Sequence, residues 1–284
     1  MSFQTLTSAN AEMATYDLTG ERMGFFTDTT LCIGCKACEV ACKEWNQLPA
    51  DGYSLSGESY DNTGALSGTT WRHVAFVEQF DGEARDLVAP LAADGGGRWL
   101  MSSDVCKHCT HAACLDVCPT GALFRTEFGT VVVQDDVCNG CGYCVPACPF
   151  GVIDRRPDTG RAAKCTLCYD RLKDGQKPAC AKACPTESIQ FGELSVLRER
   201  AQKRLEKTAT INSRAQLYGA DQSDGVGGFG AFFLLTDSPE VYGLPPAPTV
   251  TTRDLGAMWK AAAMAGAALA AAMVVCAIGS SDVR

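Results

Sequence analysis

Cysteine spacing constrains this chain more than any other feature. The 284 residues include 17 cysteines, and four of them fall within "CIGCKACEVAC", separated by two, two and three residues. The same spacing returns in "CNGCGYCVPAC", and two further groups keep the opening C-x-x-C and the closing C-x-x-x-C around a wider middle gap. The four groups are Cys32, Cys35, Cys38 and Cys42; Cys106, Cys109, Cys114 and Cys118; Cys138, Cys141, Cys144 and Cys148; and Cys165, Cys168, Cys180 and Cys184. Only Cys276 stands outside them.

This spacing indicates 4Fe-4S clusters. Three thiolates on a tight loop can each reach one iron, while the fourth, one helical turn further on, points away and ligates another cluster. Disulfides would imply a secreted scaffold, and the opening residues show neither the basic stretch nor the apolar run of an export signal. A zinc ribbon lacks the closing C-x-x-x-C, and a thioredoxin-like pair needs a single C-x-x-C in a βαβ context. Four complete sets therefore predict four 4Fe-4S clusters.

Two hairpins are expected beside the cysteine groups. Apolar and polar residues alternate around a Glu-Phe-Gly turn in "GALFRTEFGTVVVQ", and the turn "PDTG" separates "GVIDRR" from "RAAKC". Motif and hairpin form an internal repeat, the build of small ferredoxins. We therefore expect an α+β fold of two ferredoxin-like dicluster halves. The half built from the second and third groups would be inserted into the half built from the first and fourth.

Exchange of the last cysteine within each half is our hypothesis for the ligands. Lys43 follows Cys42, whereas proline follows the last cysteine in the other three groups, so we expect this first helix to continue towards Trp45. The expected sets are Cys32, Cys35, Cys38 and Cys184; Cys165, Cys168, Cys180 and Cys42; Cys106, Cys109, Cys114 and Cys148; and Cys138, Cys141, Cys144 and Cys118.

The rest of the chain divides by composition. Gly, Ser and Asp dominate the start of 46–100, and the strand-like "WRHVAFVEQF" follows, which predicts a surface insertion with some strand. A basic run at 193–207 predicts a helix whose polar side is either solvated or a contact face. The expected parts are an N-terminal extension at 1–24, the first part of the outer half at 25–105 with its insertion at 46–100, the inserted half at 106–160, the second part of the outer half at 161–195, a docking tail at 196–254, and an anchor helix with a short end at 255–284.

Several classes of site are disfavoured. The net charge of -8 argues against a nucleic-acid partner, because binding phosphates needs a basic excess. "GVGGFG" satisfies G-x-G-x-x-G but leads into the strand-like "AFFLLT" instead of a helix, so we expect a loop and not a dinucleotide site. His73, His108 and His111 are too few to ligate two haems and are expected at the surface or beside cluster ligands. No catalytic residue is expected in this chain.

The C-terminal run "AAAMAGAALAAAMVVCAI" is the candidate membrane segment. These eighteen residues, 261–278, carry no charge. As a helix they would span about 27 Å, close to the ~30 Å core of a bilayer. Trp259 and Lys260 stand where interfacial residues are expected. We therefore expect a single membrane-spanning helix, with a helix buried in a soluble complex as the alternative.

The sequence resembles the iron-sulfur (beta) subunits of membrane-bound molybdenum or tungsten oxidoreductases, and most closely those of respiratory formate dehydrogenase. The likeness is carried by "CIGCKACEVACKEWN", "CGYCVPACPF", "KCTLCYDR", "PACAKACPTESIQFG" and the tail "GVGGFGAFFLLTDSPEVYGLPPAP". The cysteine groups alone define a wider family, which also serves dimethyl sulfoxide, polysulfide and nitrite reductases and some hydrogenases.

The resemblance implies an electron-transfer subunit with two partners. One would be a catalytic subunit with a molybdopterin site, and the other a membrane cytochrome b that passes electrons to quinone. The resemblance also implies a place at the cytoplasmic membrane, with the body on the periplasmic face after export with a signal-bearing partner. A freestanding polyferredoxin is the alternative, and the terminal helix and long tail favour the subunit.

Overall fold

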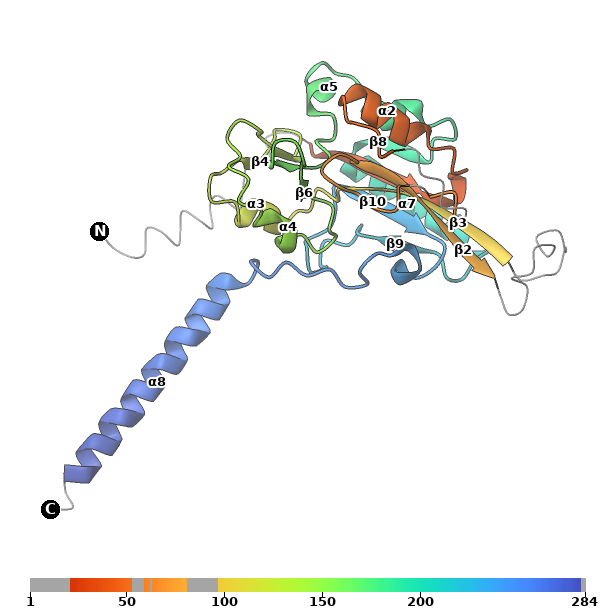
Figure 1. Ribbon diagram of the computed structural model, residues 1–284. Helices are drawn as coiled ribbons and strands as arrows, with labels where there is room; N and C mark the ends of the chain where they lie inside the picture. Colours follow the sequence, from red (N-terminus) through yellow and green to blue (C-terminus); the bar gives the residue numbers. More distant parts are fainter. Residues whose placement is uncertain (1–20, 53–58, 62, 81–96, 282–284) are drawn as a thin grey trace. The chain divides into compact units, whose positions relative to one another are not determined.

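A four-stranded sheet forms the centre of the larger unit. The computed structural model describes residues 21–52, 59–61, 63–80 and 97–281, of which 21–250 form one unit and 251–281 belong to another. The strands are β1 Met23–Asp28, β8 Ile189–Glu193, β9 Gln216–Tyr218 and β10 Ala231–Leu235. In the order β8-β1-β10-β9, β1 runs parallel to β10 and antiparallel to β8, and β9 runs antiparallel to β10 (Figure 1). Both ends of this unit therefore meet in one sheet.

The main core lies between this sheet and helix α7 Leu194–Ala209. Every residue of β10 is buried, and the rings of Phe26 and Phe232 stack with their centroids 5.3 Å apart. Leu197 and Ala201 of α7 pack into the same core, which confirms the helix expected at 193–207. Burying a large apolar side chain contributes about 1.5–3 kcal/mol to stability. The segment 196–254, expected as a docking tail, thus supplies most of α7 and all of β9 and β10 to the larger unit, with β10 entirely in its interior.

A long hairpin is formed largely by the segment expected as an insertion, 46–100. Strands β2 Arg72–Phe80 and β3 Gly97–Val105 pair antiparallel, which confirms the strand expected in "WRHVAFVEQF". Where the two strands meet the rest of the unit, Val74, Ser103 and Val105 are at most 1% exposed. This end of the hairpin is therefore an interior wall and not a surface insertion. The parts of the insertion at 53–58, 62 and 81–96 lie outside the described residues.

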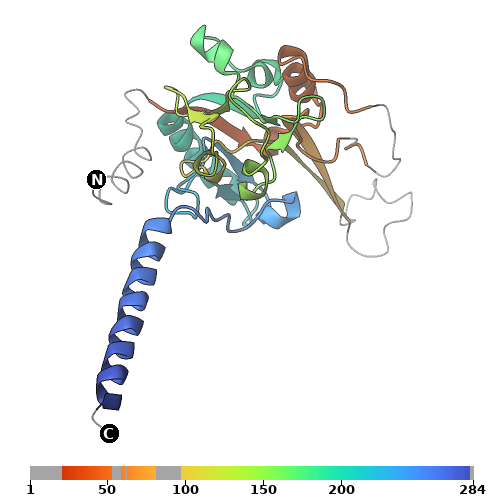
Figure 2. The same cartoon turned by 60° about the vertical axis from the view of Figure 1, so that its left-hand side comes forward.

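The second and third cysteine groups lie among short elements of their own. Strand β4 Leu123–Arg125 pairs with β5 Val131–Val133, and β6 Asp154–Arg155 pairs with β7 Ala162–Ala163, so both expected hairpins are confirmed. The short helices of the unit are α3 Ala113–Asp116, α4 Cys144–Ala147, α5 Tyr169–Lys173, α6 Ala179–Ala183, η1 Thr29–Leu31 and η3 Pro239–Tyr242. The yellow-green segments around α3, α4, β4 and β6 form a group of loops at one side of the central sheet in Figure 1, and the same loops come forward in Figure 2.

Helix α2 Ala37–Trp45 continues past Cys42, as the missing proline predicts. It carries Trp45 to helix α5, where the indole Nε1 donates a hydrogen bond to Asp170 Oδ2 at 2.8 Å. The Arg171 guanidinium lies 4.1 Å from the centroid of the Trp45 ring, a cation–π contact that contributes roughly 0.5–2 kcal/mol. The extended helix thereby joins the first cysteine group to the fourth.

Helix α8 Leu255–Ser281 belongs to the second unit. Its 27 residues begin before the predicted 261–278 stretch, and at ~1.5 Å per residue they extend about 40 Å. Residues 255–274 are long and apolar enough to cross a membrane. Their side chains are exposed on every side, Trp259 to 72%. A helix that is apolar all round needs lipid or protein to cover it.

The packing around Gly219 generates a stability prediction. Gly219 has φ +81°, and a Cβ there would lie 1.8 Å from Cδ2 of Phe229, whose ring packs edge-on against Tyr218 and Phe150. We expect Gly219→Ala to combine left-handed backbone strain with overpacking. Gly175→Ala is the matched control, because its φ is +66° but nothing lies within 4 Å of the new Cβ. Gly219→Ala should cost about 1–3 kcal/mol more than Gly175→Ala, measured as a lower midpoint of thermal unfolding; equal midpoints would contradict the packing.

Candidate iron-sulfur centres

One cavity is lined by Cys32, Cys35, Cys38 and Cys184. The first three lie on or beside the turn that leads into α2, and Cys184 caps α6. The turn depends on Gly34, which has φ +66° and whose added Cβ would lie 2.7 Å from a Phe76 ring carbon. Three cysteines close together in sequence and one from the fourth group therefore line the same space.

A second cavity is lined by Cys106, Cys109, Cys114 and Cys148. The first three occupy the connection from β3 into α3, and Cys148 ends α4. Apolar residues, Val131 among them, form much of the remaining wall. Here the last cysteine of the third group joins the first three of the second.

The sulfur of Cys42 lies among those of the fourth group. Burial is the main cause that raises the pKa of Cys42 above its ordinary value, followed by negative charge on Cys165, Cys180 and Cys168. Burial and the neighbouring Cys180 likewise raise the pKa of Cys168 to about 11. These effects require the sulfurs to be close in an environment of low polarity.

The remaining set gathers around the third group. Burial, together with the charges of Cys138, Cys141 and Cys118, raises the pKa of Cys144 to about 11. Cys118, the last cysteine of the second group, thus lies near the third group. Each of the two cavities brings together three cysteines of one group and the last cysteine of another, while Cys42 lies near the fourth group and Cys118 near the third.

The donors fit iron-sulfur clusters better than single ions. Within the described ranges, no three His, Cys, Asp or Glu side chains converge tightly enough to hold one metal ion, whereas a zinc site holds its sulfurs about 2.3 Å from the metal. Four cysteines around a cavity are the donor set of a 4Fe-4S cluster. Burial raises the pKa of Cys38 to about 11 and of Cys114 to about 12, so iron must displace protons from these thiols as it binds.

Three almost fully buried cations lie beside the sulfurs, and sequence reasoning missed all of them. Arg72, Lys107 and Lys164 are 1%, 0% and 2% exposed. Arg72 Nη2 lies 3.3 Å from Cys180 Sγ, and both lysines line the second cavity. The lysines directly adjoin cysteines in "VCKHC" and "AAKC", a signal that could have found them. Arg72 stands far from any cysteine in sequence, so no local pattern points to it.

Two of the three histidines lie as expected, His111 at the surface and His108 beside the second cavity, whereas His73 is buried next to Asp61. His108 is 1% exposed, lines the second cavity and accepts a hydrogen bond from the Val131 backbone N–H at Nδ1, 3.1 Å away. Burial and then the charge of Lys164 lower the pKa of His108 well below its ordinary value, so the ring is neutral. His73 lies 2.7 Å from Asp61, and His111 is exposed.

Two family models cover most of the larger unit. Both describe 4Fe-4S dicluster domains, and they match residues 31–122 and 97–194. Two dicluster domains imply four 4Fe-4S clusters, which confirms the predicted cofactors.

Comparison with known proteins gives the same result over more of the sequence. The formate dehydrogenase iron-sulfur subunit of Haemophilus influenzae is 38% identical over 86% of this chain and 76% of its own length. The iron-sulfur subunit of the nitrate-inducible formate dehydrogenase of Escherichia coli is 38% identical over 83% of this chain and 76% of its own length. The B subunit of the anaerobic dimethyl sulfoxide reductase of Escherichia coli is 34% identical over 62% of this chain and 76% of its own length. The predicted resemblance is confirmed: the chain belongs to the family of iron-sulfur subunits that includes those of formate dehydrogenase.

Proposed function

We propose that this chain is the electron-transfer subunit of a formate dehydrogenase complex. It takes electrons one at a time from a catalytic subunit with molybdopterin and Mo or W, and delivers them to a membrane cytochrome b and quinone. The observation that carries the proposal is the 38% identity to formate dehydrogenase iron-sulfur subunits over most of this chain. Oxidation of formate releases two electrons, and four bound clusters would supply reversible one-electron redox chemistry.

We propose the four mixed cysteine sets as the cluster ligands. Cys32, Cys35 and Cys38 act with Cys184, and the exchange of last cysteines repeats in the other three sets. The support is the shared wall of each cavity and the mutual effect of the sulfurs on their pKa values. In these sets the second and third groups exchange cysteines only with each other, and so do the first and fourth. Residues 106–160 would therefore form one ferredoxin-like half, inserted into the half built from the first and fourth groups.

The chain's own residues space the clusters and shield them. Val74 and Ile189 line the first cavity, and Val131 and Ile153 line the second. Apolar walls exclude water, and a low-polarity setting strengthens the effect of each nearby charge on a cluster's potential. Buried cations favour the reduced, more negative state of a cluster.

We propose that α8 anchors the subunit in the cytoplasmic membrane as a single-pass helix, with the body at the periplasmic face. Its fully exposed apolar surface supports the anchor. Alanines and glycines along the helix suit close packing against another membrane helix. The periplasmic side rests on the family resemblance.

A second candidate is the same role in an S-oxide reductase complex. The B subunit of dimethyl sulfoxide reductase is 34% identical, but the match covers 62% of this chain. The formate dehydrogenase subunits match 83–86% of it, so the larger share of the sequence favours formate.

The ligand sets predict the effect of Cys42→Ser. This change should disturb the cluster held by Cys165, Cys168 and Cys180 and spare the one held by Cys32, Cys35 and Cys38, although Cys42 belongs to the first group in sequence. Electron paramagnetic resonance of the dithionite-reduced complex measures the loss. Cys276→Ser is the control and should change no signal. Damage confined to the cluster of the first group would contradict the exchange.

The proposed substrate predicts reduction by formate. The chain should purify from its source membranes with a molybdopterin-containing subunit, and formate should bleach the cluster absorbance of that complex. Dimethyl sulfoxide is the comparison. A complex whose dithionite-reduced clusters are reoxidised by dimethyl sulfoxide, and which formate leaves oxidised, belongs to the second candidate.

A further inference from the structure

Arg72 is a buried cation without a carboxylate partner. It is 1% exposed in strand β2, and no described carboxylate forms an ion pair with it. Its guanidinium stacks on the ring of Phe25, 4.9 Å from the centroid. Burying an unpaired charge is costly unless negative groups compensate for it. Here cysteine sulfurs would compensate for it, because they carry negative charge as the thiolates of the proposed clusters.

The hydrogen bonds of Arg72 connect two cysteine sets. Nη2 donates to Cys180 Sγ at 3.3 Å, and Nη1 donates to the carbonyl and hydroxyl oxygens of Ser103 at 3.2 and 3.3 Å. The Ser103 hydroxyl lies 3.3 Å from Cys38 Sγ. Because Nη1 already donates to that oxygen, the hydroxyl proton is free to point at the sulfur. A continuous chain of contacts therefore runs from Cys38 through Ser103 and Arg72 to Cys180.

We propose that Arg72 and Ser103 form a shared cationic bridge that raises the midpoint potentials of two neighbouring clusters together. The inference rests on the proposed ligand sets, in which Cys38 belongs to one cluster and Cys180 to the next. Hydrogen bonds to ligand sulfurs and nearby positive charge stabilise the reduced state of a cluster. An arginine stays protonated throughout the physiological range, so the bridge acts independently of pH.

The bridge predicts different effects for its two members. Arg72→Met removes the charge and should lower the potentials of both clusters, whereas Ser103→Ala removes only the contact to Cys38 and should lower mainly the first. Arg72→Lys keeps the charge and should shift both less than Arg72→Met. Ser102→Ala is the matched control, because Ser102 is 2% exposed on the neighbouring position of β3 and its hydroxyl has no partner.

Redox titration of the intact complex, followed by electron paramagnetic resonance, measures these shifts without an activity assay. The clusters of the Cys106 and Cys138 sets should keep their potentials. Four loaded clusters with unmoved potentials in both Arg72→Lys and Ser103→Ala would overturn the bridge. Shifts in the Cys106 or Cys138 sets instead would overturn the ligand assignment on which it rests. If Arg72→Met fails to load its clusters, Ser103→Ala and Arg72→Lys still decide the outcome.

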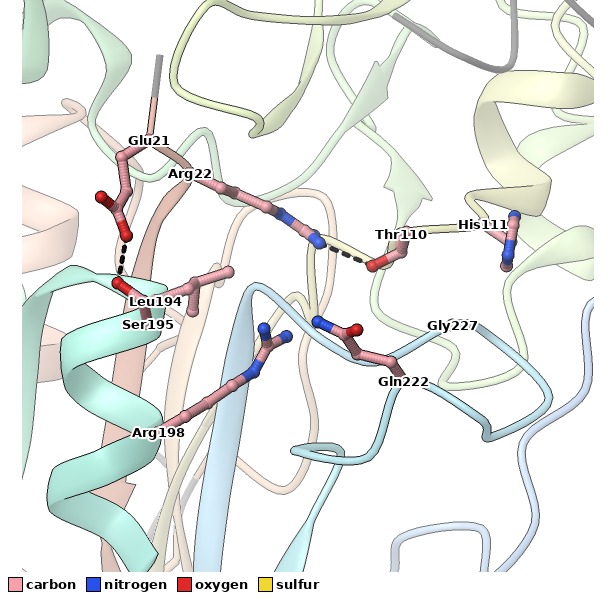
Figure 3. Close-up of a pocket in the computed structure, with 9 residues that line it drawn as sticks. All are labelled: Glu21, Arg22, Thr110, His111, Leu194, Ser195, Arg198, Gln222 and Gly227. Atoms are coloured by element: carbon pink, nitrogen blue, oxygen red, sulfur yellow. Dashed lines mark hydrogen bonds between the residues drawn. The ribbon is translucent and has the colours of Figure 1, made fainter. Parts of the chain in front are cut away.

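A surface pocket carries a second, independent inference. Figure 3 shows Arg22, just before β1, reaching across to Thr110, with Arg198 of α7 and Gln222 pointing into the space beside it. The pocket has a volume of about 440 Å³, within the usual range for small-molecule sites. Arginines drawn together in this way repel each other unless an anion lies between them.

Both guanidiniums are incompletely satisfied. The Nε atoms of Arg22 and Arg198 are buried without a hydrogen-bond partner, and no described carboxylate forms an ion pair with either side chain. The one carboxylate in the wall, Glu21, accepts a hydrogen bond from Ser195. Burial, and then the positive charges of Arg125 and Arg198, lowers the pKa of Arg22 to about 9. Positive charge is thus left uncompensated at this site.

The "GVGGFG" loop shapes the pocket but offers it no amides. Each backbone N–H from Val226 to Ala231 already bonds within the protein, for example to Asp224. A Cβ on Gly228 would lie 3.5 Å from Arg198 Nη2, and one on Gly230 would lie 3.2 Å from Arg22 Nη2. The loop therefore does not cradle a pyrophosphate, and its glycines leave room beside the guanidiniums.

We propose that this pocket binds a phosphate-class dianion through Arg22, Arg198 and Gln222. Two guanidiniums match two negative charges. Arg22 already donates through Nη1 to the Thr110 hydroxyl and through Nη2 to the His108 carbonyl, so its unpaired Nε and the guanidinium of Arg198 are the groups left to donate to the anion. A monocarboxylate would neutralise only one of the two guanidiniums.

Isothermal titration of the purified complex with inorganic phosphate at low ionic strength tests the site. We expect saturable binding that Arg198→Gln weakens about 10- to 100-fold, the effect of losing a charged hydrogen-bond donor. Arg200→Gln is the control, because Arg200 lies on the exposed side of α7 and bonds Gln190. Absence of binding, equal binding by Arg198→Gln, or acetate binding as tightly as phosphate would each overturn the proposal.

Discussion

The parallel pairing of β1 with β10 organises the rest of the larger unit. It places Phe25 opposite Ala231, more than two hundred residues away in sequence, and β8 covers the other edge of β1. The first cysteine group follows β1, and the fourth ends just before β8. The backbone N–H groups of Gly230 and Ala231 bond to the carbonyls of His108 and Lys107 and so fix the second group. Neighbouring strands of one sheet therefore position three of the four cysteine groups.

Local features of this fold could be predicted from sequence, and the central sheet could not. Turn residues between segments of alternating apolar and polar residues predict the hairpins β4–β5 and β6–β7. The absence of a proline after Cys42 predicts the extension of α2 to Trp45. Strand β10 is an apolar run of five residues whose partner lies at the other end of the chain. No short-range pattern encodes that pairing, so the sequence predicted only a docking tail for the segment 196–254.

The candidate site shows the same division. Its cysteines follow from spacing alone, because the geometry of a cluster restricts where thiolates stand on a chain. The charged residues around them do not follow, because Arg72 reaches Cys180 only through the tertiary packing of β2. Composition also misleads here: the net charge of -8 is a sum over the whole chain and gives no sign that fully buried cations lie beside the sulfurs inside. Electrostatic tuning of such a site has to be read from the folded interior.

The division of the cysteine sets has a consequence for biosynthesis. Residues 106–163 carry the second and third groups together with both small hairpins, so this stretch contains every donor of its two proposed clusters as it leaves the ribosome. The first group emerges earlier, but its proposed sets are complete only after Cys180 and Cys184 have been synthesised, and the sheet beside them only after β10. The inner pair of proposed sets is therefore complete within one contiguous stretch, whereas the outer pair is closed only when the last strand of the sheet is in place.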